Sequence, residues 1–190
     1  SVLNYCIIRM NAGEELYVRE VFDLYCQALD TQLILVNGQI TPWSFKNIVT
    51  AGLRLNEFDW VEKFIHENNK FLDEKFRENA ITFNLAQLYF YKKEYKKVIE
   101  QLSKVEYEDF TYNLNSKTLL MASFYELDEY EALNSLLDAF RLYVQRNKKL
   151  TKGKGSHYLN TISIVRKLAK STPGDTRQIE RLIKEVNEAQ

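Results

Sequence analysis

The chain has 190 residues, 45% of them hydrophobic, and its 26 basic and 26 acidic side chains give a formal net charge of zero. This balance gives no reason to expect that the chain as a whole binds nucleic acid or a membrane surface. Six glycines and two prolines are few for a chain with many strands and turns, whereas residues that favour helices are abundant. Composition therefore indicates an all-α protein with ample apolar residues for a core.

No apolar run reaches the roughly 18–20 residues that a transmembrane helix needs, and no signal-peptide pattern is present. Because the chain begins at Ser1 and not at Met, we expect a trimmed chain or a fragment. Two cysteines, Cys6 and Cys26, make neither a disulfide framework nor a metal-ligand spacing. We expect both to be small buried side chains in a reduced, cytoplasmic protein without cofactor or metal, although a disulfide between neighbouring helices stays open.

The first thirty residues predict a helical hairpin. Residues 1–12 have apolar side chains at helical spacing, Gly13 interrupts the pattern, and residues 14–29 form a second helix. The acidic residues that open the second helix suit its positive N-terminal end. The expected buried stripe of this helix is Leu16, Val21, Leu24 and Ala28.

Residues 30–40 combine a short apolar run with the turn-forming pair Asn37-Gly38. A single strand would have no partner, so we interpret the segment as an ordered loop with apolar anchors. Thr41 and Pro42 then have the residue types of a helix N-cap and first helical position, which predicts a new helix. Further helices are expected at 42–55, 57–68, 76–92, 94–105, 109–126, 128–148 and 156–170, with a last helix after Thr172-Pro173 that ends near Glu188.

A repeated pattern runs through the middle of the chain, and its best copy is the stretch 84–105. This copy reads as two short helices folded back on each other around a turn at Lys92–Glu94. Its Asn-aliphatic start and its acidic-aromatic pair, Glu94-Tyr95, recur 37 residues earlier at Asn47 and Glu57. The helical features recur again 35 residues later. A period near 34 residues in a helix-turn-helix unit is typical of tetratricopeptide repeats.

The chain therefore resembles the tetratricopeptide-repeat (TPR) family. Leu85, Ala86 and Tyr89 match the large–small–aromatic pattern of the first helix, and Tyr95, Val98, Leu102 and Val105 match the second helix. The family's packing tryptophan and unit-ending proline are absent. The resemblance implies an all-α solenoid of about five antiparallel hairpins that form a right-handed superhelix and a single domain. Its expected ranges are 1–190 for the domain, 41–148 for the best repeats, and 1–30 and 156–188 for the capping hairpins.

The resemblance also implies a concave groove lined by the first helix of each hairpin. Asn47 and Asn84 match an asparagine with which some TPR proteins hold a peptide backbone, because a carboxamide both donates and accepts hydrogen bonds. Aromatic neighbours would supply apolar anchor surface. The residues implied to face the ligand are Trp43, Lys46, Asn47, Thr50, Arg54, Phe83, Asn84, Gln87, Phe90, Tyr91, Asn115, Thr118, Ala122 and Tyr125. The expected core counterparts in the central copy are Leu85, Tyr89, Tyr95, Val98 and Leu102.

A basic segment follows the best repeats. Between Arg141 and Lys170 there are nine basic and no acidic residues, so the rest of the chain has 17 basic and 26 acidic residues, a net charge of −9. Such a block could attract phosphate, nucleic acid or an acidic protein, or its charges could instead stabilise helix C-terminal ends. The nine residues are Arg141, Arg146, Lys148, Lys149, Lys152, Lys154, Arg166, Lys167 and Lys170.

No catalytic pattern is visible, because the two histidines, His66 and His157, lie far apart and have no Cys, Ser-Asp or second His at a functional spacing. We expect both at the surface. The sequence predicts a non-enzymatic module, part of a larger protein, that binds a protein or peptide. Binding of nucleic acid or an anion through residues 141–170 is the first alternative, and a purely structural or oligomerisation role is the second; the oligomeric state is open.

Overall fold

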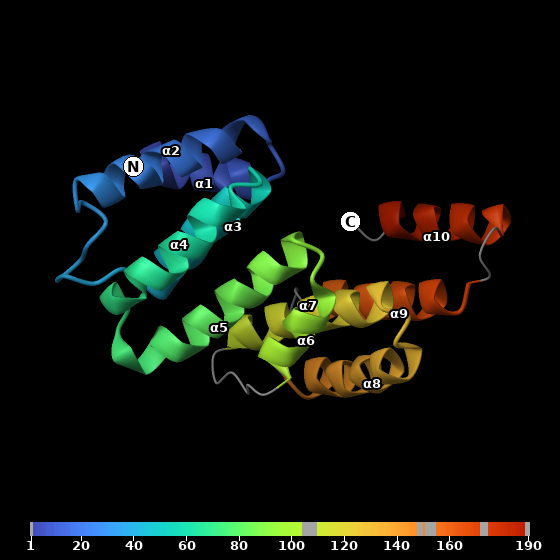
Figure 1. Cartoon of the computed structure of the whole chain (residues 1–190). Helices are drawn as coiled ribbons and strands as arrows, with labels where there is room; N and C mark the ends of the chain where they lie inside the picture. Colours follow the sequence, from blue (N-terminus) through green and yellow to red (C-terminus); the bar gives the residue numbers. More distant parts are fainter. Residues whose placement is uncertain (1, 104–109, 148–149, 151–154, 172–174, 189–190) are drawn as a thin grey trace. The chain divides into compact units, whose positions relative to one another are not determined.

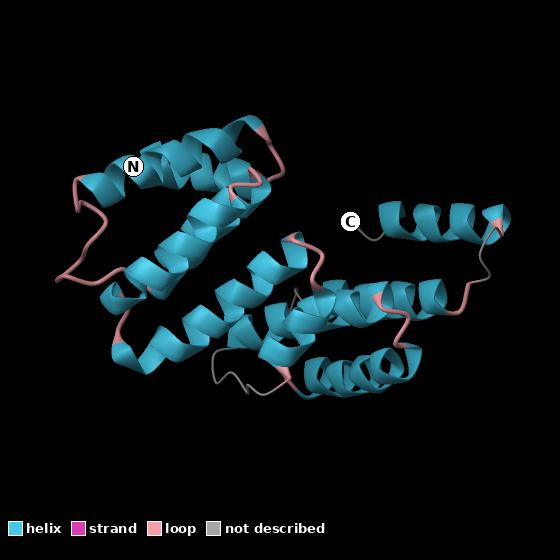
Figure 2. Ribbon diagram, in the orientation of Figure 1, coloured by secondary structure: helices cyan, strands magenta, loops and turns pink. Residues whose placement is uncertain are grey.

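The computed structural model describes residues 2–103, 110–147, 150, 155–171 and 175–188. Throughout these residues the regular structure is helical and there are no strands, which confirms the all-α prediction (Figures 1 and 2). The α-helices are α1 (Val2–Asn11), α2 (Leu16–Asp30), α3 (Pro42–Arg54), α4 (Phe58–Asn68), α5 (Glu74–Tyr91), α6 (Tyr95–Leu102), α7 (Phe110–Glu126), α8 (Tyr130–Arg146), α9 (Gly155–Ala169) and α10 (Thr176–Glu188). A short 3₁₀ helix, η1 (Asn69–Phe71), follows α4.

The chain divides into two compact units, unit 1 (Ser1–Leu119) and unit 2 (Leu120–Gln190). The boundary falls inside α7. In unit 1, α1 packs on α2, α2 on α3, α3 on both α4 and α5, and α5 on α4 and α6. In unit 2, α8 packs on α9 and α9 on α10. A single domain over the whole chain stays a prediction.

Four helices end in the same hydrogen-bonded turn. After α3, Asn56 has a φ of 60°, and the N–H of Glu57 donates to Gly52 O at 3.0 Å. After α5, Lys93 has a φ of 59°, and the N–H of Glu94 donates to Tyr89 O at 2.8 Å. This left-handed residue with a six-to-one hydrogen bond is a Schellman motif. The same arrangement follows α1 at Gly13 and α7 at Asp128.

This recurrence confirms the predicted turn at Lys92–Glu94 and shows that the sequence period corresponds to a repeated local structure. The turn residues Asn56, Lys93 and Asp128 stand at the same offsets as the sequence copies. Each turn reverses the chain so that the next helix begins within two residues. A short connection of this kind places two helices side by side and antiparallel.

The core of unit 1 is rich in aromatic and β-branched side chains. Phe45 of α3 is fully buried and lies 4.8 Å, centroid to centroid, from Phe64 of α4. A Cβ atom added at Gly52 would lie 2.5 Å from Cγ2 of Val61, so the missing side chain lets α3 and α4 approach closely. Because of this packing, α3 is one of the most buried of the described helices. Its buried residues are Phe45, Ile48, Val49, Ala51, Gly52 and Leu53.

Helix starts follow the predicted capping chemistry in part. The Thr41 hydroxyl accepts a hydrogen bond from the Ser44 N–H at 3.1 Å, and Pro42 opens α3, as expected. The last helix begins at Thr176, and the predicted N-cap pair Thr172-Pro173 lies outside the described residues. There the Asp175 carboxylate accepts from the Gln178 N–H at 3.1 Å.

The loop between α2 and α3 has the predicted apolar anchors. Asn37 and Gly38 both have positive φ, the signature of a type I′ turn, and they join the isolated bridge between Val36 and Gln39. Ile40 is buried, and its N–H donates to Phe71 O at 2.8 Å. The interpretation as an ordered loop is confirmed by these contacts.

The predicted buried stripe of the second helix needs correction. In α2, Val21 is buried as predicted, Leu24 and Ala28 are half-buried, and Leu16 is exposed at the start of the helix. The helix also buries Val18, Phe22 and Tyr25. In α10 an apolar stripe is formed by Ile179, Leu182, Ile183 and Val186, of which Leu182 is buried and the other three are exposed. Cys6 is buried as expected, but Cys26 is half-buried, and both are free thiols. Burial raises the pKa of the Cys26 thiol.

Candidate functional site

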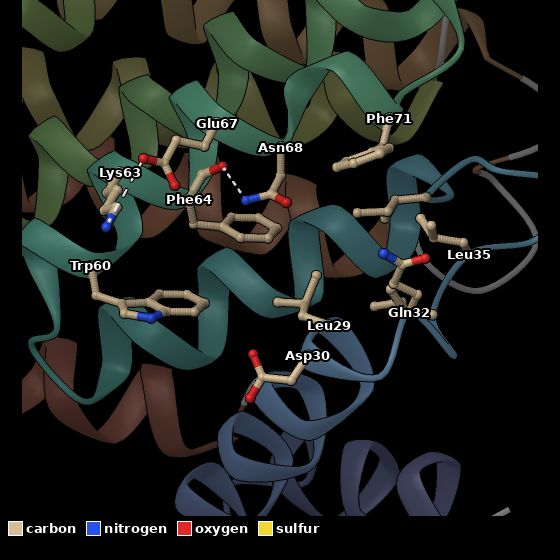
Figure 3. A pocket seen from close by; sticks show the side chains of 12 residues that line it. Leu29, Asp30, Gln32, Leu35, Trp60, Lys63, Phe64, Glu67, Asn68 and Phe71 are labelled. Atoms are coloured by element: carbon tan, nitrogen blue, oxygen red, sulfur yellow. Dashed lines mark hydrogen bonds and ion pairs between the residues drawn. The ribbon is translucent and has the colours of Figure 1, made fainter.

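An apolar pocket of about 330 Å³ opens in unit 1 between the end of α2, the loop after it, and α4 with η1 (Figure 3). The loop reaches the pocket because Ile40 is anchored to Phe71 of η1. Two stretches of the chain, 29–40 and 60–71, thus supply its walls. The lining residues are Leu29, Asp30, Gln32, Ile34, Leu35, Ile40, Trp60, Lys63, Phe64, Glu67, Asn68 and Phe71.

The wall from α4 is aromatic and rigidly packed. The rings of Trp60 and Phe64 are stacked, with an interplanar angle of 4° and centroids 5.4 Å apart. Trp60 also lies edge-on to Phe22 of α2, with centroids 4.8 Å apart. These contacts fix the indole, while part of its surface remains accessible in the pocket. An aromatic face that is fixed by its neighbours can bind an apolar side chain of a ligand.

The polar side chains stand around this apolar wall. Lys63 and Glu67, one turn apart on α4, form an exposed ion pair at 4.0 Å. Asn68 donates through Nδ2 to Phe64 O at 3.2 Å, as the dashed line in Figure 3 shows. Asp30 is exposed at the α2 edge. Two carboxylates and one ammonium therefore surround the opening, which gives it a slight excess of negative charge.

Two residues that the resemblance places in an open groove are buried. Phe83 has a relative accessibility of 1%, and its ring lies edge-on to Tyr112 of α7 with centroids 5.0 Å apart. Asn84 has a relative accessibility of 0%, and its Nδ2 donates to Ala80 O of its own helix at 2.7 Å. The expectation that these residues face a ligand is wrong for this structure.

The error has a physical origin in the packing of α5. This helix contacts α3, α4 and α6, and Phe83 also meets α7, so little of its circumference stays exposed. Spacing in the sequence shows which residues share a face of a helix. It does not show which of these faces are covered by neighbouring helices. Val98 and Leu102 are buried as predicted, whereas Leu85, Tyr89 and Tyr95 are only half-buried.

Two further groove candidates on α3 bind the N-terminal hairpin instead. Asn47 Nδ2 donates to the Tyr25 hydroxyl at 3.4 Å, and burial raises the pKa of Tyr25. Arg54 donates through Nη1 to Met10 O at 3.0 Å and through Nη2 to the Glu15 carboxylate at 2.5 Å. Both side chains thus join α3 to α1 and α2, and their local role is structural.

The remaining groove candidates are distributed over the two units. Trp43 is 56% exposed, and Lys46 Nζ lies 5.7 Å from its ring and 5.6 Å from that of Phe83. Tyr91 is exposed at the end of α5, and burial of part of its surface raises the pKa of its hydroxyl. The other candidates, Thr50, Gln87, Phe90, Asn115, Ala122 and Tyr125, are half-buried, while Thr118 is exposed. Phe90 packs edge-on against Tyr95, and Tyr125 against Tyr130.

The basic segment is only partly described, because Lys148, Lys149, Lys152 and Lys154 lie outside the described residues. Arg141, Arg146 and Lys170 are exposed. Arg166 pairs with Asp138 at 2.7 Å, and Lys167 pairs with Glu185 at 2.6 Å. The structure therefore places acidic partners from α8 and α10 beside two of the nine cations.

The pocket in unit 1 was not predicted from the sequence, from which residues 30–40 were interpreted only as a loop with apolar anchors. The usable signal was the aromatic spacing of Trp60 and Phe64, at i and i+4 on one face of α4, directly after an apolar loop. The tertiary contact between Ile40 and Phe71, far apart in the sequence, completes the pocket. No local pattern reveals such a contact.

His66 and His157 are both exposed, as predicted. Among the described residues, no group of three His, Cys, Asp or Glu side chains could hold a metal ion. None of the described helices is long and apolar enough to span a bilayer. Comparisons with models of protein families, with curated proteins and with solved structures found no match to this chain.

Proposed function

We propose that this chain is a non-enzymatic helical-repeat module that binds an apolar anchor residue of a partner peptide in the pocket formed by α2, α4 and the loop between α2 and α3. The observation that carries the proposal is the stacked Trp60–Phe64 wall facing an accessible apolar pocket. A volume of about 330 Å³ is at the low end of ligand pockets, which span roughly 300–1,000 Å³. It suits one large side chain better than a bulky cofactor.

The surroundings of the pocket favour a defined peptide chemistry. Asp30 and Glu67 outnumber Lys63 at the opening, so a basic residue next to the apolar anchor would be favoured. The loop that forms one wall also exposes Leu33 and Val36, by 82% and 62%, which extends the apolar surface available to a peptide. Apolar anchors in pockets with a polar rim dominate many peptide interfaces.

The finer architecture belongs to the same proposal. The repeated Schellman turns at Gly13, Asn56, Lys93 and Asp128 support a TPR-like, right-handed solenoid of about five antiparallel hairpins. Free thiols at Cys6 and Cys26 fit a module that works in the reducing cytoplasm.

Selection of a random-peptide display library on the immobilised chain tests the binding site. We expect enriched peptides that share one large apolar residue next to a basic residue. The variant Trp43→Phe leaves Trp60 as the only tryptophan, so its fluorescence reports the pocket directly. Leu35→Trp, which fills the pocket, should raise the Kd of the peptide by about ten-fold or more, equivalent to about 1.4 kcal/mol. Fluorescence anisotropy of a labelled peptide measures this Kd.

Trp43→Ala is the matched control, because it removes the exposed indole of the predicted groove and leaves the pocket intact. If binding depends on Trp43 and not on Leu35, the groove is the site and the pocket proposal fails. Light scattering covers the oligomerisation alternative. An assembly that dissociates in Leu35→Trp would show that the pocket holds a second copy of the chain and not a peptide.

A further inference from the structure

Unit 2 contains a second cleft, of about 280 Å³, between α8 and α9. Helix α8 contributes Arg141 and Gln145, and α9 contributes Ser163 and Arg166. Two apolar side chains of α9, Leu159 and Ile162, complete the lining. Two guanidinium groups, a carboxamide and a hydroxyl therefore converge on one concave surface, and none of the lining residues is acidic.

The donors of this cleft are only partly used within the protein. Arg166 donates through Nη2 to the Asp138 carboxylate at 2.7 Å, whereas its Nε, which is buried, has no hydrogen-bond partner among the described residues. Arg141 is exposed. The guanidinium of arginine has five N–H donors in a planar fork that matches carboxylate and phosphate oxygens. The cleft can thus offer several donors to an anion.

The chemistry favours a phosphoryl group over a carboxylate. A phosphoryl group carries a charge of about −1.5 to −2 near neutral pH and has three acceptor oxygens, enough for two guanidinium groups and a neutral donor. A carboxylate has one negative charge and only two oxygens. Arg141 and Arg166 both line the cleft, and no lining residue is acidic, so the local field is positive.

The surroundings favour a single phosphorylated side chain over a nucleic-acid strand. Asp138 and Glu185 lie beside the basic residues that they pair with, and they would repel a continuous polyanion. Tyr158 packs against Phe140 with ring centroids 5.8 Å apart, so it is not a free stacking platform. Leu159 and Ile162 instead provide apolar surface for the carbon atoms of a peptide.

We propose that the cleft between α8 and α9 binds the phosphoryl group of a phosphorylated serine or threonine in a partner peptide. Arg141 and Arg166 hold the phosphoryl oxygens, and Gln145 and Ser163 supply neutral donors. Asp138 competes for Arg166 in the free protein. This inference concerns different residues from the pocket in unit 1 and does not depend on the function proposed for that pocket.

Binding of a library of fluorescent peptides, each with one phosphoserine among random residues, tests the proposal on the full chain. We expect binding that the unphosphorylated library does not show and that inorganic phosphate displaces. Arg141→Ala and Arg166→Ala should each weaken binding by about ten-fold or more, as loss of a charge-assisted contact does. Asp138→Asn should strengthen binding, because it releases Arg166 without removing a helical side chain.

The matched control is Arg146→Ala, which removes the same charge from α8 but does not line the cleft. An equal loss in this variant would show diffuse electrostatic attraction and overturn the proposal. Equal binding of unphosphorylated peptides would overturn it as well. Tighter binding of single-stranded RNA, with a steep loss on adding salt, would reassign the surface to a polyanion. Arg141→Ala keeps the test valid if Arg166→Ala impairs folding, since Arg141 is exposed.

Discussion

Unit 1 and unit 2 use similar helices but bury their apolar residues to different extents. In unit 1, α3 is covered by α2, α4 and α5, and Phe45 and Ile48 are completely buried. In unit 2, α10 packs on α9 alone among the described pairs, and Ile179, Ile183 and Val186 of its stripe remain exposed. A helix surrounded by neighbours is thus stabilised mainly by packing, whereas a helix at the edge depends on one contact face.

Removal of a large side chain from the core of unit 1 should separate the two units most clearly. Phe45→Ala deletes a fully buried ring that packs on Phe64, and it should lower the free energy of unfolding of unit 1 by about 3–5 kcal/mol. Hydrogen exchange followed by mass spectrometry should show lost protection in α3 and α4 but not in α8 and α9. Equal loss in both units would show that they unfold as one cooperative body.

The repeated turns offer a stabilising change. Lys93 is an exposed non-glycine residue at a φ of 59°, a conformation that side chains with a Cβ disfavour. Lys93→Gly should raise the free energy of unfolding of unit 1 by about 0.5–1 kcal/mol, because relief of backbone strain exceeds the added entropy of the unfolded chain. Denaturant unfolding measures the change. Lys96→Gly, in the first turn of α6, is the control and should destabilise instead.

The ion pair between Glu62 and Lys92 joins α4 to the end of α5 at 2.8 Å. Its hydrogen bond lowers the pKa of Glu62 below the ordinary value of 4.5 and raises the pKa of Lys92 above 10.5. The stability from Glu62 is therefore present above pH 4.5 and is lost as the pH falls through the lowered pKa. The stability from Lys92 is present below pH 10.5 and is lost as the pH rises through the raised pKa.

Because both side chains are partly exposed, Lys92→Met should cost only about 0.5 kcal/mol near neutral pH. The variant should also flatten the dependence of stability on acid pH, as measured by thermal unfolding between pH 3 and pH 7. Lys96→Met, which removes an exposed lysine of α6, provides the control. A loss above about 2 kcal/mol would mean that the pair is desolvated like a buried ion pair.

The smallest expected effect is at the edge of unit 2. Ile183 is 55% exposed on α10, so Ile183→Lys should change the free energy of unfolding by no more than about 0.5 kcal/mol. Leu182→Lys, at the buried neighbour, should cost several times more. A large effect at Ile183 would show that the stripe is covered in solution, and concentration-dependent unfolding would then identify a second copy as the cover.

Capping and turn chemistry explain what was predictable. Thr41-Pro42, Asn37-Gly38 and the turn at Lys92–Glu94 act through bonds between residues at most five apart, so their residue types already specify the local structure. The buried face of α2 was harder to predict from the sequence. Leu16 and Val18 are both apolar, and the sequence pattern does not show that the helix begins at Leu16 and leaves it exposed. The prediction that Phe83 lines a groove was wrong for a related reason, because the ring of Tyr112 in α7, distant in the sequence, covers it.

The amino-acid sequence is enough to predict that this protein is helical, where most of the described helices begin and end, and that one hairpin turn recurs along the chain. These features depend on local hydrogen bonds, capping side chains and periodicity. The sequence does not reveal that Asn84 is buried, that Trp60 lines a pocket, or that Arg141 and Arg166 share a cleft. Those properties depend on which faces of neighbouring helices meet, and such contacts are set by packing of the whole unit.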